Sequence, residues 1–212
     1  MCNDKKQRIV IVGGGAAGMM AAISAARWGA DVTILERNSR IGKKILATGN
    51  GRCNYTNIYA GDIKYYHGQN PKFAYSALSQ FGVEQTIDFF ESLGISHKVE
   101  EMGKVFPMSD QASSILDVMR YELEQAGVKL ICDAFVKEII PIGNGFKIRT
   151  EHDLELTADR VIIATGGKAK PSTGSDGNGY DLAKKMGHTI IDIFPGLVQL
   201  KLKGDFFHQI NG

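Results

Sequence analysis

Arg8-Ile9-Val10-Ile11-Val12-Gly13-Gly14-Gly15-Ala16-Ala17-Gly18 is the stretch that decides the fold of this 212-residue chain. An apolar, β-forming run, a glycine turn and an alanine-rich segment predict a strand at 8–12 and a helix at 16–28. The glycines have the spacing G-x-G-x-x-G. Gly13 allows a sharp turn, Gly15 leaves room for a pyrophosphate, and Gly18 lets the helix approach the strand. With Ala16 and Ala17 they predict a phosphate-binding turn at the positive end of a helix.

A second predicted strand, at 31–36, ends on an acid. Glu36 is expected to accept hydrogen bonds from ribose hydroxyls. A carboxylate at this point repels a 2′-phosphate, so the sequence favours FAD or NAD over NADP. The strand–helix–strand unit is expected to be right-handed and to begin a parallel sheet.

A membrane segment is the competing interpretation of the same stretch. Residues 9–26 carry no charge, and Lys5, Lys6 and Arg8 precede them. However, four glycines and six alanines make the stretch only weakly hydrophobic, which disfavours a signal peptide or an anchor. No other stretch has the length that a bilayer span needs, so no membrane partner is expected.

Composition narrows the classes of function. With 25 basic and 23 acidic residues and a net charge of +2, the chain has no polybasic tail, and no nucleic-acid partner is expected. Three cysteines without C-x-x-C spacing predict a cytoplasmic protein without disulfides. The histidines have no metal-ligand spacing, so no metal site is predicted.

The remainder of the chain predicts a mixture of helices and strands. After a long loop at 38–62, helices are expected at 71–80, 83–93 and, from an Asp110 N-cap, to Ala126. An extended piece at 97–106 separates the second helix from the third. Strands are expected at 128–132, 136–142, 146–150, 154–156 and 160–165. A short helix ending at Gly187 and an extended piece at 190–203 follow.

Glycine and basic residues are concentrated in the loop after Glu36. Gly49 and Gly51, which follow Thr48, allow a close backbone approach to an anion or to a flavin carbonyl. A solvated basic face is the alternative to a pyrophosphate-binding role for the charged residues, which are Arg37, Lys43, Lys44 and Arg52. Asn50 and Asn54 are candidates for hydrogen bonds to the flavin ring edge, and each could equally cap the local turn.

Cys53 invites a redox interpretation, which the sequence disfavours. Disulfide-reducing flavoenzymes carry a C-x-x-x-x-C pair, and here a single cysteine stands in this loop. A small, buried packing residue is the preferred interpretation. No Ser-His-Asp spacing, paired carboxylates or covalent flavin attachment motif is recognised, so the catalytic residues stay unassigned.

Several motifs together resemble a known family. A βαβ unit, a meander and the later Ala164-Thr165-Gly166-Gly167 turn resemble two-dinucleotide-binding-domain flavoproteins. The motifs G-K-K at 42–44, T-G-N-G-R-C-N-Y-T-N at 48–57, G-K-V-F-P at 103–107 and G-S-D-G-N-G-Y at 174–180 are similar to the aminoacetone-oxidase-type family. That family is also called NAD(FAD)-utilizing dehydrogenases. The resemblance implies that Val136 contacts adenine and that the Ala164–Gly167 turn packs beside the cofactor.

The resemblance implies an α/β, Rossmann-like FAD-binding domain with a parallel sheet, helices on both faces and a small antiparallel β-meander at about 133–158. This domain is expected to cover residues 1–197. Residues 198–212 are expected to start a truncated inserted substrate domain, so the C-terminal remainder of the same protein is an expected partner.

The resemblance also implies an FAD-dependent oxidoreductase, with non-covalent FAD between a small-molecule substrate and an acceptor. NAD(P)H is a candidate transient electron donor. Two alternatives stay open: a catalytically inactive nucleotide-binding fragment that needs a partner segment, and an NAD-dependent dehydrogenase. Little or no turnover is expected from residues 1–212 alone.

Overall fold

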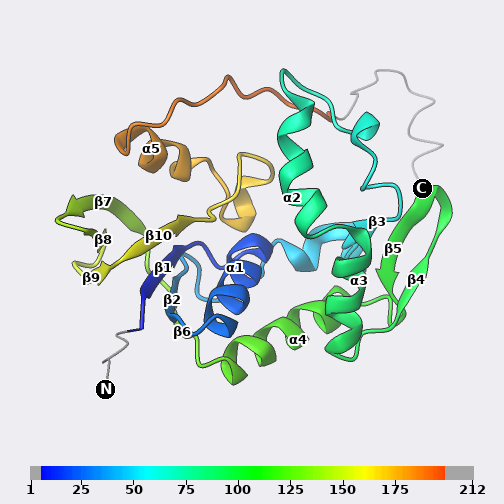
Figure 1. Ribbon diagram of the computed structural model, residues 1–212, viewed down its shortest axis with the longest axis horizontal. Helices are drawn as coiled ribbons and strands as arrows, with labels where there is room; N and C mark the ends of the chain where they lie inside the picture. The colour runs from blue at the N-terminus through cyan, green and yellow to red at the C-terminus, as the bar shows by residue number, and fades with distance from the viewer. Residues whose placement is uncertain (1–5, 199–212) are drawn as a thin grey trace, which may run out of the picture.

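The structure is a computed structural model that describes residues 6–198. Its centre is a four-stranded parallel sheet in the order β10-β1-β2-β6 (Figure 1). In this sheet Val10 pairs with Val161 on one side and Thr33 on the other. The strands are β1 (Arg8–Val12), β2 (Asp31–Leu35), β6 (Lys129–Ile131) and β10 (Arg160–Ile163). The predicted parallel sheet is thus confirmed.

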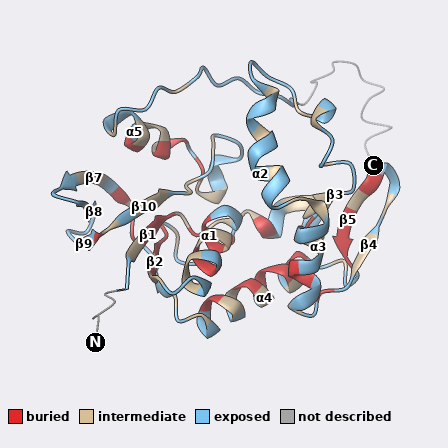
Figure 2. Ribbon diagram, in the orientation of Figure 1, coloured by how far each residue is buried: buried red, intermediate tan, exposed pale blue. Residues whose placement is uncertain are grey.

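Two helices cover one face of the sheet. They are α1 (Ala16–Arg27) and α4 (Ala112–Gln125). Ile11 and Ile34 of the sheet pack with Met19 of α1 and Met119 of α4, and all four side chains are at most 1% exposed. The buried residues of these helices face the sheet, as Figure 2 shows. This face holds the larger of the two hydrophobic clusters. Ile11 and Ile34 reach it because successive side chains of a strand point to opposite faces of the sheet.

The opposite face carries a meander and one short helix. Val10, Val12 and Leu35 pack there against Ile148 of the meander and Leu182 of the helix. The elements are β7 (Val136–Ile142), β8 (Gly145–Thr150), β9 (Glu155–Ala158) and α5 (Asn178–Lys185). The predicted meander between two strands of the parallel sheet is confirmed. Its sheet shares this face with helix α5, so helices lie on both faces of the parallel sheet as expected.

A second antiparallel sheet lies at the other end of the molecule (Figure 1). Its order is β3-β5-β4, formed by β3 (Thr56–Asn57), β4 (His97–Val99) and β5 (Lys104–Pro107). The expected extended piece at 97–106 is therefore a hairpin. The neighbouring helices are α2 (Tyr75–Gln80) and α3 (Val83–Ser92).

Three local predictions are corrected. The segment 38–62 is not simply a loop, because it contains a 3-10 turn at Ile45–Gly51 and strand β3. Asp110 is not the N-cap of α4. Gln111 takes that position, while Asp110 forms an ion pair with Lys98 at 2.5 Å. The extended piece expected at 190–203 has no regular strand over 190–198, and 199–203 lie outside the described residues.

Candidate dinucleotide-binding site

The glycine turn after β1 is built by close backbone packing. Gly13 has φ +108°, and a Cβ at this position would lie 2.6 Å from the carbonyl oxygen of Ala164. A Cβ on Gly18 would lie 1.9 Å from the carbonyl oxygen of Gly13. The turn therefore requires glycine at both positions, for conformation at the first and for space at both. This is the helix-to-strand approach that the sequence predicts.

Gly15 has different surroundings. It has φ −79°, which any residue adopts, and a Cβ built there meets no protein atom within 4 Å. Neither conformation nor packing requires glycine here. Gly15 is also the N-cap residue of α1 and gives the helix no side-chain cap. The space above it is open toward the positive end of the helix, where an anion binds favourably.

Glu36 lies at the end of β2 and is only 7% exposed. Its Oε2 accepts a hydrogen bond from the Gly14 amide at 2.7 Å, and its Oε1 accepts one from the Asn38 amide at 2.8 Å. The Asn38 side-chain amide donates a further hydrogen bond to Oε1 at 2.6 Å. Backbone donors thus fix a buried carboxylate beside the glycine turn.

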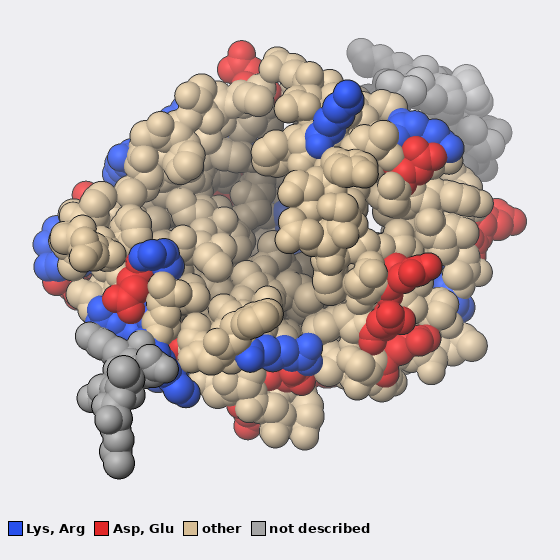
Figure 3. All heavy atoms as spheres, in the orientation of Figure 1, with Lys and Arg blue, Asp and Glu red and all other residues tan. Residues whose placement is uncertain are grey.

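A cavity of about 610 Å³ joins these features. It extends from the glycine turn and Glu36 to the β10 end and to α5. Figure 3 shows a hollow on the displayed face, between α5 and α2. Its size lies in the range of small-molecule and cofactor sites, roughly 300–1,000 Å³. The predicted contacts that line it are Gly13, Gly15, Ala16, Ala17, Glu36, Arg37, Lys43, Lys44, Thr48, Val136, Ala164, Thr165 and Gly166.

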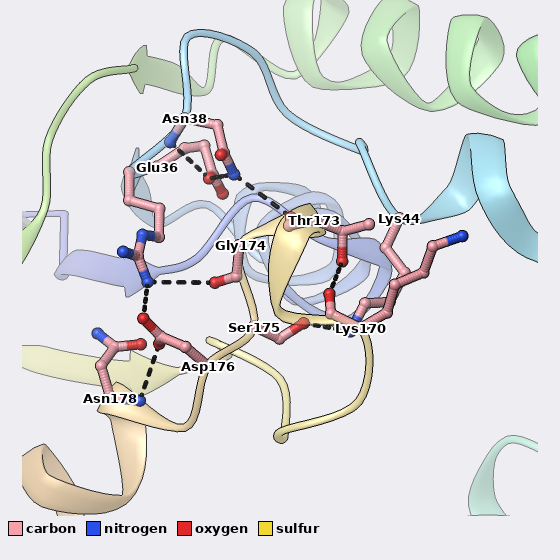
Figure 4. Close-up of polar contacts among 10 residues, drawn as sticks. Glu36, Asn38, Lys44, Lys170, Thr173, Gly174, Ser175, Asp176 and Asn178 are labelled. Carbon is pink, nitrogen blue, oxygen red and sulfur yellow. Dashed lines mark hydrogen bonds and ion pairs between the residues drawn. The ribbon is translucent and has the colours of Figure 1, made fainter. Parts of the chain in front are cut away.

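One loop, formed by residues 168–177 and here called the crossing loop, is tied to the segment after β2 (Figure 4). Lys44 donates from Nζ to the carbonyl of Ala169 at 2.8 Å and to the hydroxyl of Ser175. Arg37 forms an ion pair with Asp176, with 2.6 Å between Nη1 and Oδ2. Both cations were predicted near a pyrophosphate. They line the cavity, and their charged ends also hold the crossing loop.

Eight of the predicted cofactor contacts do not line the cavity. They are Gly18, Gly167 and the second part of the 48–57 motif, namely Gly49, Asn50, Gly51, Arg52, Cys53 and Asn54. Their assignment as cofactor contacts stays a prediction. The guanidinium of Arg52 pairs with Glu100 at 2.8 Å and Asp110 at 3.3 Å, and it stacks 4.0 Å from the centre of the Phe106 ring. Its charge is therefore used to fasten the loop to the β4–β5 hairpin.

This charged cluster predicts a loss of stability in acid. The hydrogen bond from Lys98 holds the pKa of Asp110 below its ordinary 3.8, and the hydrogen bond from Arg52 holds that of Glu100 below its ordinary 4.5. Lowered pKa values stabilise the folded state above these ordinary values, and this stability is lost as the pH falls through the folded-state values. Asp110→Asn should therefore show a shallower fall in urea midpoint than the wild type between about pH 5 and pH 2.

Asparagine suits this position because Asp110 has φ +54°, a conformation that asparagine tolerates. Asp192→Asn, in the exposed segment after α5, is the matched control for charge. Equal pH slopes for the wild type and both variants would show that the cluster does not stabilise the fold.

Cys53 is 6% exposed and belongs to the large core cluster. Burial raises the pKa of its thiol, and a hydrogen bond with Thr48 offsets part of the increase. The interpretation of Cys53 as a packing residue is thus supported, because a buried thiol of raised pKa is a poor nucleophile.

We expect iodoacetamide to label Cys53 in the native protein on the order of a hundredfold more slowly than in urea, with peptide mass analysis as the readout. Cys132, which is only half-buried, is the internal comparison. Rapid labelling of native Cys53 would contradict the packing interpretation.

Further lining residues have no role that the sequence predicts. Among them are Asn38, Arg40, Ala134, Phe135, Ser175, Asn178 and Tyr180. The available signal was the motif at 174–180, which was noted as a family feature without roles for its residues. Among residues 6–198, no helix has both the length and the apolar character needed to cross a bilayer.

Comparisons with known proteins identify the family of the chain. The family described as "HI0933-like protein Rossmann domain" matches residues 7–203. The 3-dehydro-bile acid delta(4,6)-reductase of Clostridium scindens is 50% identical over 97% of this chain and 50% of its own length. The ribosomal RNA dihydrouridine synthase of Escherichia coli is 32% identical over 95% of this chain and 50% of its own. The chain thus spans about half the length of these curated relatives.

Solved structures share the fold at low sequence identity. A flavocytochrome c3 fumarate reductase in its open conformation aligns with a TM-score of 0.57 and 18% identity, over 86% of this chain and 41% of that one. THI4 of Thermovibrio ammonificans aligns with a TM-score of 0.50 and 19% identity, over 86% of this chain and 62% of that one. At these identities the likeness concerns the fold alone.

Proposed function

The chain belongs to the HI0933-like Rossmann-domain family of FAD-dependent oxidoreductases, and on this basis we propose that its cavity binds FAD non-covalently. The observation that carries the proposal is the open position at Gly15 beside a buried, fixed carboxylate. A site for the ADP half of a dinucleotide needs these two features, namely room for a pyrophosphate at a helix N-terminus and an acceptor for ribose hydroxyls.

The remaining lining of the cavity also suits FAD. Val136, the expected adenine contact, and Ala164 provide apolar surface, while Lys43 and Thr48 add a cation and a hydroxyl. In the proposed complex, the chain positions the cofactor and keeps water from its apolar parts. FAD, when bound, supplies hydride transfer that amino-acid side chains do not provide.

For the whole protein we propose reduction of a small organic substrate, with NAD(P)H as the electron donor. The name of the 50% identical relative, a delta(4,6)-reductase, supports the reductive direction and a substrate with conjugated double bonds. The aminoacetone-oxidase-type resemblance supports the opposite direction, which is our second candidate. A cytoplasmic location is part of the proposal, supported by the free thiols of Cys53 and Cys132.

A small molecule is favoured over RNA as the substrate, although two relatives are named for ribosomal RNA. The net charge is +2, and basic and acidic side chains are mixed on the face in Figure 3. RNA binding relies on concentrated positive charge.

The test uses the whole protein loaded with FAD, because little turnover is expected from residues 1–212 alone. It is mixed anaerobically with NADH or NADPH and then with a 3-dehydro-bile acid that carries double bonds at positions 4 and 6. We expect the flavin absorbance to bleach with the nucleotide and to return with the bile acid. Bleaching by aminoacetone, with no response to the bile acid, would contradict the reductive direction. Bound FAD that no donor reduces would support the alternative of a nucleotide-binding unit without turnover.

A further inference from the structure

Because of Arg37, the sequence alone does not decide whether the site takes an adenosine ribose with a free 2′-hydroxyl or one with a 2′-phosphate. Glu36 favours a free 2′-hydroxyl, but an arginine near this position is the usual receptor of a 2′-phosphate. Arg37 follows Glu36 directly and lines the same cavity. If its guanidinium is free to bind a phosphate, the site can accept a dinucleotide with a 2′-phosphate; if it is paired within the protein, the site discriminates against one.

In the structure, Arg37 forms an ion pair with Asp176 of the crossing loop. Nη1 of Arg37 lies 2.6 Å from Oδ2 of Asp176, and the guanidinium lies 4.8 Å from the centre of the Phe135 ring. The other carboxylate oxygen of Asp176 accepts a hydrogen bond from the amide of Asn178 at 3.2 Å. The hydrogen bond from Arg37 also holds the pKa of Asp176 below its ordinary value, so Asp176 is charged at neutral pH.

The crossing loop holds Asp176 in this place through further contacts. Ser175, its neighbour, is 5% exposed and accepts a hydrogen bond from Lys44. At Gly174, a Cβ would lie 2.5 Å from the side-chain nitrogen of Asn38. The position of Asp176 relative to Arg37 is thus set also by the packing of the two preceding residues, and not only by one exposed ion pair, which would contribute little.

We propose that Asp176 is a specificity-determining residue. By pairing with Arg37, it keeps this arginine from receiving a 2′-phosphate, while Glu36 keeps a negative charge at the ribose end. The site then accepts a dinucleotide with a free 2′-hydroxyl. The inference rests on the proposed function, because it assumes that the ADP half binds at the glycine turn.

ADP-ribose and ADP-ribose 2′-phosphate are the probes, since they differ only in the 2′-phosphate. We expect the wild type to bind ADP-ribose at least about tenfold more tightly than its 2′-phosphate, and Asp176→Asn to shift this ratio roughly tenfold toward the phosphorylated probe. Asp181→Asn removes the same charge from neighbouring α5 and should leave the ratio unchanged. The shift should fade in about 1 M salt, where screening is strong.

A double variant identifies the cation. Arg37→Gln combined with Asp176→Asn should return the ratio to near the wild-type value, because the phosphate receptor is gone. If the double variant keeps the shifted ratio, the receptor is another cation, such as Arg40, which also lines the cavity, and the proposal is wrong. An unchanged ratio in Asp176→Asn overturns it as well. A wild type that binds neither probe nor FAD overturns the proposed function itself.

Discussion

Replacing Gly15 with leucine is expected to weaken the binding of FAD and ADP by at least about a hundredfold, or roughly 2.7 kcal/mol. The free energy of unfolding of the apo protein should fall by no more than about 1 kcal/mol, because leucine is a poorer N-cap than glycine. Gly15 has an ordinary φ, and a Cβ built there meets nothing in the protein. The added side chain would occupy only the space that we assign to a pyrophosphate. Calorimetric titration and urea unfolding measure the two quantities.

Gly61→Leu is the matched control. A Cβ on Gly61 also meets no atom within 4 Å, and Gly61 is absent from the cavity lining. It should leave both affinity and stability near wild-type values. Retained affinity for FAD or ADP in Gly15→Leu would refute the assignment of the phosphate site, whereas loss of the fold would show that Gly15 has a structural role.

Substitution of Gly18, three residues after Gly15, is expected to lower the stability of the apo protein. Gly18→Ala should destabilise the protein by about 3 kcal/mol or more, although glycine to alanine inside a helix normally stabilises by about 1 kcal/mol. The sign reverses because the new Cβ would lie 1.9 Å from the carbonyl oxygen of Gly13, a backbone atom that cannot move without opening the turn. Urea unfolding of the apo protein measures the effect.

Ser24→Ala, at an exposed position of the same helix, controls for helix propensity and should be neutral or slightly stabilising. Unchanged stability in Gly18→Ala would mean that α1 lies farther from the glycine turn than the structure shows. Together, the Gly15 and Gly18 variants separate the two roles that one motif combines.

The parts of the fold that depend on nearby residues were predictable from the sequence. The β1–α1–β2 unit follows from apolar periodicity and from glycines whose roles are local. The meander follows from short apolar runs with a turn at Gly143 and Asn144. At the site, the glycine turn and Glu36 needed no tertiary information, because the strand, the helix and the acid are adjacent in sequence.

Contacts between distant segments were not predictable. Arg37 and Asp176 lie 139 positions apart, and nothing in either neighbourhood indicates that they pair. The sequence predicts Arg52 near a pyrophosphate because it belongs to a cluster of cations in one loop, and it gives no sign of the ion pairs of Arg52 with Glu100 and Asp110. The cap of α4 was misassigned for the same reason, since Asp110 is used in a tertiary ion pair with Lys98.

Calorimetric titration of the apo protein with FAD, with ADP and NAD as comparisons, tests the central claim most directly. The account predicts saturable binding of FAD, tighter than that of ADP or NAD, because the cavity continues from the glycine turn past Lys43 and Thr48. Equal, weak binding of all three would restrict the site to the ADP half. Absence of binding by any of them would contradict the assignment of this cavity as a dinucleotide site.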